Sequence, residues 1–140
     1  KNNGMKILIL NGPNLNLLGT REPKIYGMVS MVDFLENLKE KFPEDEILFF
    51  QSNVEGEIIN RLQEDDYEAL IINPAAYTHY SYAIADCLRN IQKPKIEVHI
   101  SNIYAREEFR QKSLQWCHLW IWARWLPTSY FKLEIKFLLF

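Results

Sequence analysis

Short apolar runs alternate with amphipathic stretches along this chain, and the alternation predicts its elements. The apolar runs predict four strands, at 5–10, 46–50, 69–72 and 95–100. Apolar residues recurring at three- and four-residue spacing predict helices at 31–42, 54–65 and 78–90. Ser30 can cap the first helix, and Asn73-Pro74 ends the third strand.

Strands separated by helices of about a dozen residues imply a parallel sheet with helices on both faces. The pattern therefore predicts an α/β fold of the doubly wound, flavodoxin-like kind, a three-layer sandwich. Such sheets bind their ligands at the carboxyl ends of the strands.

Composition narrows the class of protein. With 140 residues, 48% hydrophobic and 24% charged, the chain is expected to form a single domain over 1–140. A net charge of −2 gives no reason to expect nucleic acid or an anionic membrane as partner. No apolar run is long enough to span a bilayer, and the polar residues 1–4 do not resemble a signal peptide, so a cytoplasmic protein is expected.

Two smaller expectations concern the first residues and the cysteines. Residues 1–4 look like a cloning remnant ahead of a natural start at Met5. Cys87 and Cys117 form neither a disulfide framework nor a metal-ligand spacing, which favours reduced thiols.

The stretch 11–27 is too long for an ordinary connection between a strand and a helix, and is typical of a functional loop. It carries the amides Asn11, Asn14 and Asn16. It also carries Tyr26, which alone reads as a half-buried aromatic. With the cation of Arg21 nearby, however, its phenolate form can be favoured enough to act as a base. The sequence therefore predicts an active-site loop.

Polar residues also follow the other strands, where the carboxyl ends of a parallel sheet meet. They are Gln51, Ser52 and Asn53 after the second strand, and the segment 73–79 after the third. The fourth strand carries Glu97 and His99, which are two residues apart and so point to the same face. A lone strand histidine is more often a core residue, but a neighbouring carboxylate can fix its tautomer for general acid work.

Three further side chains have two readings each. Arg106 and Arg110 are spaced i, i+4 and form either a solvated face paired with Glu107 and Glu108, or a clamp for a carboxylate. His79 is either a site residue or only a polar residue in the first turn of its helix.

Four motifs carry a resemblance to a known family. The segments NGPNLNLLGTREPKIYG, FQSNVEGEIINRLQ, IINPAAYTHYSYAIADCL and PKIEVHISNIYAREEFR closely resemble type II 3-dehydroquinate dehydratase, from Met5 to about Ser113. The resemblance implies a five-stranded flavodoxin-like sheet and a hydro-lyase that needs no metal or cofactor. It implies anti elimination of water from 3-dehydroquinate through an enolate, in the shikimate pathway of aromatic amino acid biosynthesis. It also implies a homo-oligomer, a dodecamer built as a tetramer of trimers.

The resemblance assigns catalytic roles to individual positions. Tyr26 resembles the base that removes the C2 proton, and Arg21 the cation that favours its phenolate. Asn14 resembles the residue that holds a water against the enolate oxygen, and His99, oriented by Glu97, the general acid.

Other positions match the family's binding residues. Those that match substrate-binding positions are Asn73, His79, Ile100, Ser101 and Arg110. Arg106 matches an arginine near the mobile loop, and Asp86 an acidic residue that reaches a neighbouring subunit's site.

The chain departs from the family pattern in two places. Ala75 stands where the family has glycine, and alanine is strained by roughly 1 kcal/mol if this position needs a positive φ. After Ser113 the family expects a glycine-rich strand and a helix. Here all four tryptophans gather within 116–125, and no glycine follows Gly56. One explanation is a frameshift error in the sequence over about 114–126, with further errors from Lys132 on. The other is genuine divergence of this segment into an aromatic strand.

The competing function is a catalytically inactive flavodoxin-like binding protein. The joint presence of Tyr26, Arg21, Asn14 and His99 argues against it. A flavin or nucleotide binder is disfavoured because the first loop lacks a phosphate cradle and Pro13 removes a backbone donor.

Overall fold

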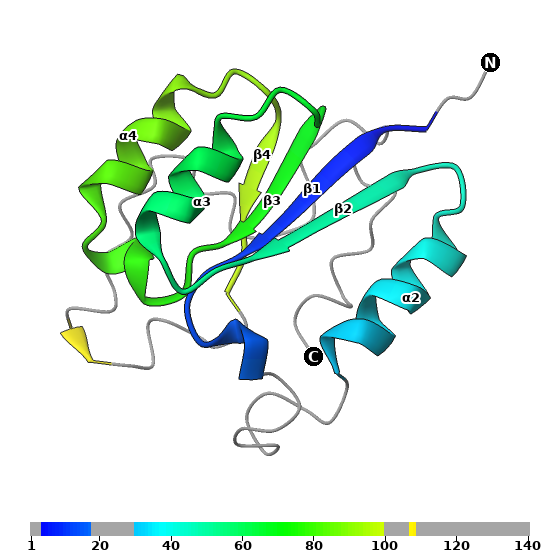
Figure 1. Ribbon diagram of the computed structural model, residues 1–140, viewed down its shortest axis with the longest axis horizontal. Coiled ribbons are helices and arrows are strands. Elements are labelled where there is room, and N and C mark those ends of the chain that lie inside the picture. Colours follow the sequence, from blue (N-terminus) through cyan, green and yellow to red (C-terminus); the bar gives the residue numbers. More distant parts are fainter. Residues whose placement is uncertain (1–3, 18–29, 100–106, 109–140) are drawn as a thin grey trace.

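The computed structural model describes residues 4–17, 30–99 and 107–108, which form a sheet flanked by helices (Figure 1). Its four strands are β1 (Lys6–Asn11), β2 (Glu46–Gln51), β3 (Ala69–Asn73) and β4 (Lys95–Glu97). Its α-helices are α2 (Met31–Lys41), α3 (Glu55–Leu62) and α4 (Tyr82–Asn90). Two short 3-10 helices, η1 (Leu15–Leu17) and η2 (Ala75–His79), follow β1 and β3.

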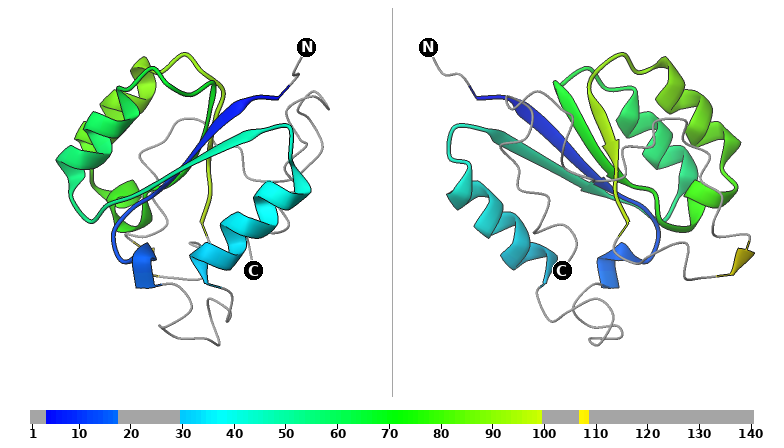
Figure 2. Two further views of the ribbon diagram at one scale, coloured as in Figure 1. Left: turned by 45° about the vertical axis from the view of Figure 1, so that its right-hand side comes forward. Right: turned by 180° about the vertical axis from the view of Figure 1, so that it is seen from behind.

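The described strands are all parallel and lie in the order β2-β1-β3-β4. The helix α2 covers one face of this sheet, and α3 and α4 cover the other (Figures 1 and 2). This arrangement confirms the predicted α/β architecture with a layer of helices on each face. The fifth strand that the family resemblance implies falls outside the described residues.

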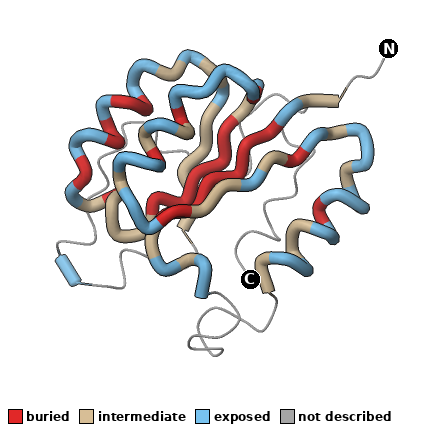
Figure 3. Tube along the Cα trace, viewed as in Figure 1, coloured by how far each residue is buried: buried red, intermediate tan, exposed pale blue. Residues whose placement is uncertain are grey.

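The core consists of two apolar clusters, one on each face of the sheet, because side chains alternate along β1 and β3. The cluster under α3 and α4 contains Leu8, Leu10, Ile58, Leu62, Tyr67, Leu70, Ile72, Ile84, Cys87 and Leu88. The cluster under α2 contains Ile7, Ile9, Leu38, Ile47, Ile71 and Val98. Buried positions therefore run almost continuously along β1 and β3 (Figure 3), as expected for central strands.

The helices predicted at 31–42 and 54–65 are found at Met31–Lys41 and Glu55–Leu62, so the second was predicted three residues too long at its end. The strand predicted at 95–100 ends at Glu97, so its predicted end was also wrong and His99 lies beyond β4. The helix predicted at 78–90 begins only at Tyr82, so the prediction was wrong for its first turn. The side chain of Ser81 accepts the N–H of Ile84 and caps α4 there, while the preceding residues form η2. The first residue of a helix is set by backbone geometry and capping hydrogen bonds, which the spacing of apolar residues does not reveal.

The described part of the chain contains no helix that is both long and apolar enough to cross a membrane.

Candidate active site

The carboxyl ends of the strands bring the predicted polar residues to one edge of the sheet. In the strand register, Asn11 at the end of β1 lies opposite both Gln51 on β2 and Asn73 on β3. Glu97 on β4 lies opposite Ile72, one residue before Asn73. The convergence that the sequence predicted is therefore confirmed for the described residues.

A glycine allows the first loop to cross closely over the end of β3. The N–H of Gly12 donates to the carbonyl of Asn73 at 2.7 Å. A Cβ added to Gly12 would lie 2.5 Å from the carbonyl oxygen of Pro74, which is backbone and cannot swing aside. Only glycine fits here, and the close contact holds the start of the 11–27 loop against the turn that follows β3.

Asn14 lies at this edge with its backbone held from β2. Its φ is 67°, a left-handed conformation that asparagine adopts more readily than most residues. Its N–H donates to Oδ1 of Asn53 at 2.9 Å. Gln51 donates through Nε2 to the carbonyl of Gly12 at 3.2 Å and to the same Asn53 oxygen at 3.1 Å. The amide side chains of Gln51 at the end of β2 and of Asn53 just after it thus hold the backbone at Gly12 and Asn14.

The side chain of Asn73 is held by the turn that follows β3. The residue is buried, and its Oδ1 accepts the N–H of Ala75 at 3.1 Å. Ala75, which stands where the family has glycine, has a φ of 52°. The condition under which alanine would be strained at this position is therefore met. With Oδ1 bonded to the turn, the Nδ2 group of Asn73 is the donor that a ligand can meet.

Glu97 and His99 are in hydrogen-bond contact, as predicted, although β4 ends at Glu97 and His99 lies beyond the strand. Nε2 of His99 lies 2.7 Å from Oε1 of Glu97, and their side chains are 20% and 8% exposed respectively. Because a carboxylate accepts hydrogen bonds, this contact assigns a proton to Nε2 of His99 and leaves Nδ1 as the other ring nitrogen. The hydroxyl of Thr78, a buried residue of η2, donates to the same Glu97 oxygen.

Two further sequence-predicted residues are described, at different places. His79 is half-buried at the end of η2, next to Thr78, rather than in the first turn of a helix. Asp86 lies on α4, where its side chain is 70% exposed and pairs with Arg89. The remaining predicted residues, Tyr26, Arg21, Ile100, Ser101, Arg106 and Arg110, lie outside the described residues.

Sequence reasoning missed Thr78 as a member of this site. Its hydroxyl contacts Glu97, which belongs to another element, and no spacing rule connects the two positions. The phenol of Tyr77 was missed in the same way; it donates to the carbonyl of Asn53 at 2.9 Å and ties η2 to the end of β2. Their position in the segment after β3 was the only signal available.

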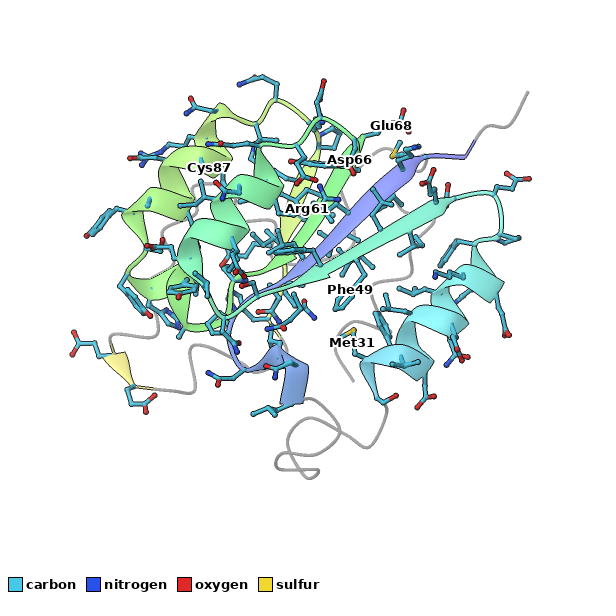
Figure 4. The ribbon with its side chains drawn as sticks, in the orientation of Figure 1. Met31, Phe49, Arg61, Asp66, Glu68 and Cys87 are labelled. Carbon is cyan, nitrogen blue, oxygen red and sulfur yellow. The ribbon has the colours of Figure 1, made fainter. Side chains whose placement is uncertain are left out.

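The opposite edge of the sheet carries charges of a different kind. Figure 4 shows Arg61, Asp66 and Glu68 near the amino ends of β1 and β3, away from η1 and η2. Arg61 pairs with Asp66 at 2.8 Å, and Glu68 accepts the backbone N–H of Lys6 at 2.8 Å. The Arg61–Asp66 pair joins α3 to the connection that leads into β3, and Glu68 joins that connection to the start of β1. Within the described ranges, no group of three His, Cys, Asp or Glu side chains is placed to hold a metal ion.

The fold and the paired Glu97 and His99 define an α/β protein with an acid–base site at the carboxyl edge of a parallel sheet. Comparison with known families gives the particular one: the model of dehydroquinase class II matches residues 5–119. The chain belongs to this family.

Curated relatives and solved structures agree with that assignment. A 3-dehydroquinate dehydratase of Caldicellulosiruptor bescii is 58% identical over 114 residues, covering 78% of this chain and 79% of the relative. That of Clostridium beijerinckii is 53% identical over 115 residues, covering 79% of each.

The crystal structure of a type II dehydroquinase from Butyrivibrio crossotus has a TM-score of 0.73 at 49% identity, covering 79% of this chain and 80% of its own. That of a type II dehydroquinase from Propionibacterium acnes has a TM-score of 0.73 at 46% identity, covering 79% of each chain. The flavodoxin-like fold expected from the sequence is thereby confirmed.

Proposed function

We propose that this chain is a type II 3-dehydroquinate dehydratase, a hydro-lyase that converts 3-dehydroquinate into 3-dehydroshikimate in the shikimate pathway. The observation that carries the proposal is the Glu97–His99 pair at the carboxyl edge of the sheet, in a chain of this family. Curated relatives at 53% and 58% identity carry the name 3-dehydroquinate dehydratase.

His99 acts as the general acid. Glu97 accepts the Nε2 proton, so a protonated imidazole presents its Nδ1–H to the hydroxyl that leaves from C1 of the substrate. Transfer of that proton as the C1–O bond breaks releases water and leaves His99 neutral. The Glu97 carboxylate stabilises the charged imidazole before the transfer.

The other half of the reaction uses the 11–27 loop. The phenolate of Tyr26, favoured by Arg21, removes the C2 proton, and the electron pair moves onto the C3 carbonyl oxygen as an enolate. Asn14 holds a water against that oxygen. When the enolate collapses, the C1–C2 double bond forms and the C1 hydroxyl departs on the opposite face, which gives anti elimination.

Substrate contacts come from the ends of β3 and β4. Asn73 offers its Nδ2 group to a ring hydroxyl, because its Oδ1 already accepts Ala75. The remaining proposed contacts come from His79, Ile100, Ser101 and Arg110, with Arg106 near the loop. The chemistry is acid–base throughout and calls for no metal or cofactor.

Asp86 acts in the site of a neighbouring subunit, within a dodecamer of four trimers in the cytoplasm. The exposure of the Asp86 side chain on α4 supports this role, since a buried carboxylate could not reach another chain. Light scattering tests the assembly: a mass of twelve chains is expected, and a monomer at micromolar concentration contradicts it.

Absorbance of the conjugated product tests the activity directly. Purified protein is expected to convert 3-dehydroquinate into an enone. Tyr26→Phe and His99→Gln are each expected to lower kcat by about 10²–10⁴-fold, because each removes one proton-transfer group. Folded wild-type protein that binds 3-dehydroquinate without converting it would support the inactive binding protein instead.

A further inference from the structure

We infer that Thr78 is a positioning residue for the general acid: it holds Glu97 so that His99 keeps its Nε2 proton on that carboxylate and leaves Nδ1 as the nitrogen that carries the proton for the leaving hydroxyl. The inference rests on the proposed dehydratase function and adds a residue to its machinery. It joins three elements: η2 supplies Thr78, β4 supplies Glu97, and His99 follows two residues later.

The first step of the argument is where Glu97 points. Ile71 and Ile72 on β3 lie opposite Ile96 and Glu97, so Glu97 shares the sheet face of Ile72, under α3 and α4. Its side chain is only 8% exposed there. A carboxyl group this deeply buried needs hydrogen-bond donors, and those donors set its position.

The second step is that two donors meet at one oxygen. The Thr78 hydroxyl and Nε2 of His99 both bond Oε1 of Glu97. Rotation of the carboxyl group that would weaken its bond to His99 must therefore also stretch the bond to Thr78. The hydroxyl fixes the acceptor, and the acceptor fixes the proton on Nε2.

The third step is why Thr78 can do this. Thr78 is 3% exposed, and η2 is held at its start and at its middle residue. Asn73 and the left-handed Ala75 set its start, and Tyr77, next to Thr78, is bonded to Asn53 on the far side. A branched Cβ restricts the χ1 angle of this buried side chain, so its hydroxyl approaches Glu97 from a restricted set of directions.

Thr78→Val tests the proposal, because valine has nearly the same shape and lacks the hydroxyl. Thr78→Ser is the matched control, since it keeps the hydroxyl and loses only a methyl group. We expect Thr78→Val to lower kcat about tenfold with KM changed less than about twofold, and Thr78→Ser to stay within about threefold of wild type. If valine leaves the protein unfolded in a thermal scan, Thr78→Ala replaces it.

Nitrogen NMR of the His99 imidazole provides a readout that does not depend on turnover. When the imidazole is titrated to its neutral form, the wild type and Thr78→Ser are expected to show protonated Nε2 and bare Nδ1, and Thr78→Val a mixture of tautomers. An Nδ1–H tautomer in the wild type overturns the proposal, and so do unchanged tautomers in Thr78→Val or equal losses of kcat in the two variants. Absence of dehydration by the wild type refutes the proposed function separately, because the imidazole signals are read without substrate.

Discussion

At the scale of single residues, two backbone positions after β1 and β3 decide the shape of the site. Gly12 is required by a close approach, and Ala75 occupies a conformation that alanine resists. Both were visible in the sequence as residues of a turn-rich segment. Only the tertiary structure shows that one is well matched to its place and the other is not.

Replacing Ala75 by glycine is expected to stabilise the fold. A φ of 52° costs alanine about 1 kcal/mol that glycine does not lose, although glycine loses more chain entropy on folding. We expect Ala75→Gly to raise the free energy of unfolding in urea by up to about 1 kcal/mol. Ala76→Gly, the adjacent residue of η2, serves as the control and should lower it; equal effects of the two variants would refute the strain.

Gly12→Ala is expected to destabilise the protein. The new methyl group would meet the Pro74 carbonyl 2.5 Å away, and moving either backbone segment disturbs the hydrogen bond between Gly12 and Asn73. We expect a loss of about 2–3 kcal/mol in urea unfolding, together with lower activity.

Gly56→Ala provides the matched control for that experiment. Gly56 lies in α3, and a Cβ there meets nothing within 4 Å. Alanine at this position should stabilise the helix by about 0.5–1 kcal/mol. A Gly12→Ala protein as stable as wild type would show that the two loops can separate at little cost.

At the scale of elements, hydrogen bonds between neighbouring segments set how the helices begin and end. Ser81 caps α4 and also donates to Glu55 in the first turn of α3, so one hydroxyl joins the starts of two helices. At the other end of α3, Arg61 bonds Asp66 in the connection to β3. The Ser81 contact therefore ties the start of α4 to the start of α3, and the Arg61 contact ties the end of α3 to the chain that leads into β3.

The Arg61–Asp66 pair predicts a pH-dependent stability. The hydrogen bond and charge of Arg61 hold the pKa of Asp66 below its usual value of 3.8, so the folded state favours the ionised carboxylate. Its contribution is present above that usual value and is lost as pH falls through the lowered folded-state pKa. Wild type should therefore exceed Asp66→Asn in thermal stability at pH 7, and the difference should shrink as the pH falls below 3.8.

Salt provides the control for this pair. Asp66 is exposed, so added salt screens its charge and should shrink the difference at pH 7. A difference of the same size at pH 3 and pH 7 would mean that the asparagine variant acts through packing rather than charge.

At the scale of the whole molecule, stability comes from β1 and β3, the central strands of the described sheet, which are packed on both faces. Leu8→Ala removes a side chain that is 0% exposed and should cost about 3 kcal/mol or more in urea unfolding. Val32→Ala, at a residue 65% exposed on α2, should change stability by less than about 0.5 kcal/mol. Similar losses in both variants would contradict a core centred on β1.

The segment after Ser113 can be tested on the intact protein. We propose that the recorded residues over about 114–126 reflect a shifted reading frame, since tryptophans cluster there and no glycine follows Gly56. The family match ends at residue 119. The mass of the intact protein, measured by mass spectrometry, is expected to differ from the mass calculated from this sequence. Agreement of the two masses would establish genuine divergence.

The sequence by itself determined the order of strands and helices, the layered α/β class and the pairing of Glu97 with His99. The order and the class follow from local periodicity, because apolar runs mark buried strands. The pairing was predicted from strand alternation and is found, although β4 ends at Glu97 and His99 lies just beyond it. The motifs around Asn14 and Asn73 also resembled those of the family, so the sequence indicated the family before any geometry was known.

Only the tertiary structure decided which side chains meet across elements. It brought Thr78 to Glu97, set Gly12 against Pro74 and began α4 at Tyr82 instead of Thr78. The physical reason is that these contacts join residues far apart in the chain or depend on backbone angles, such as the positive φ of Ala75. Neither leaves a periodic trace in the order of apolar and polar residues.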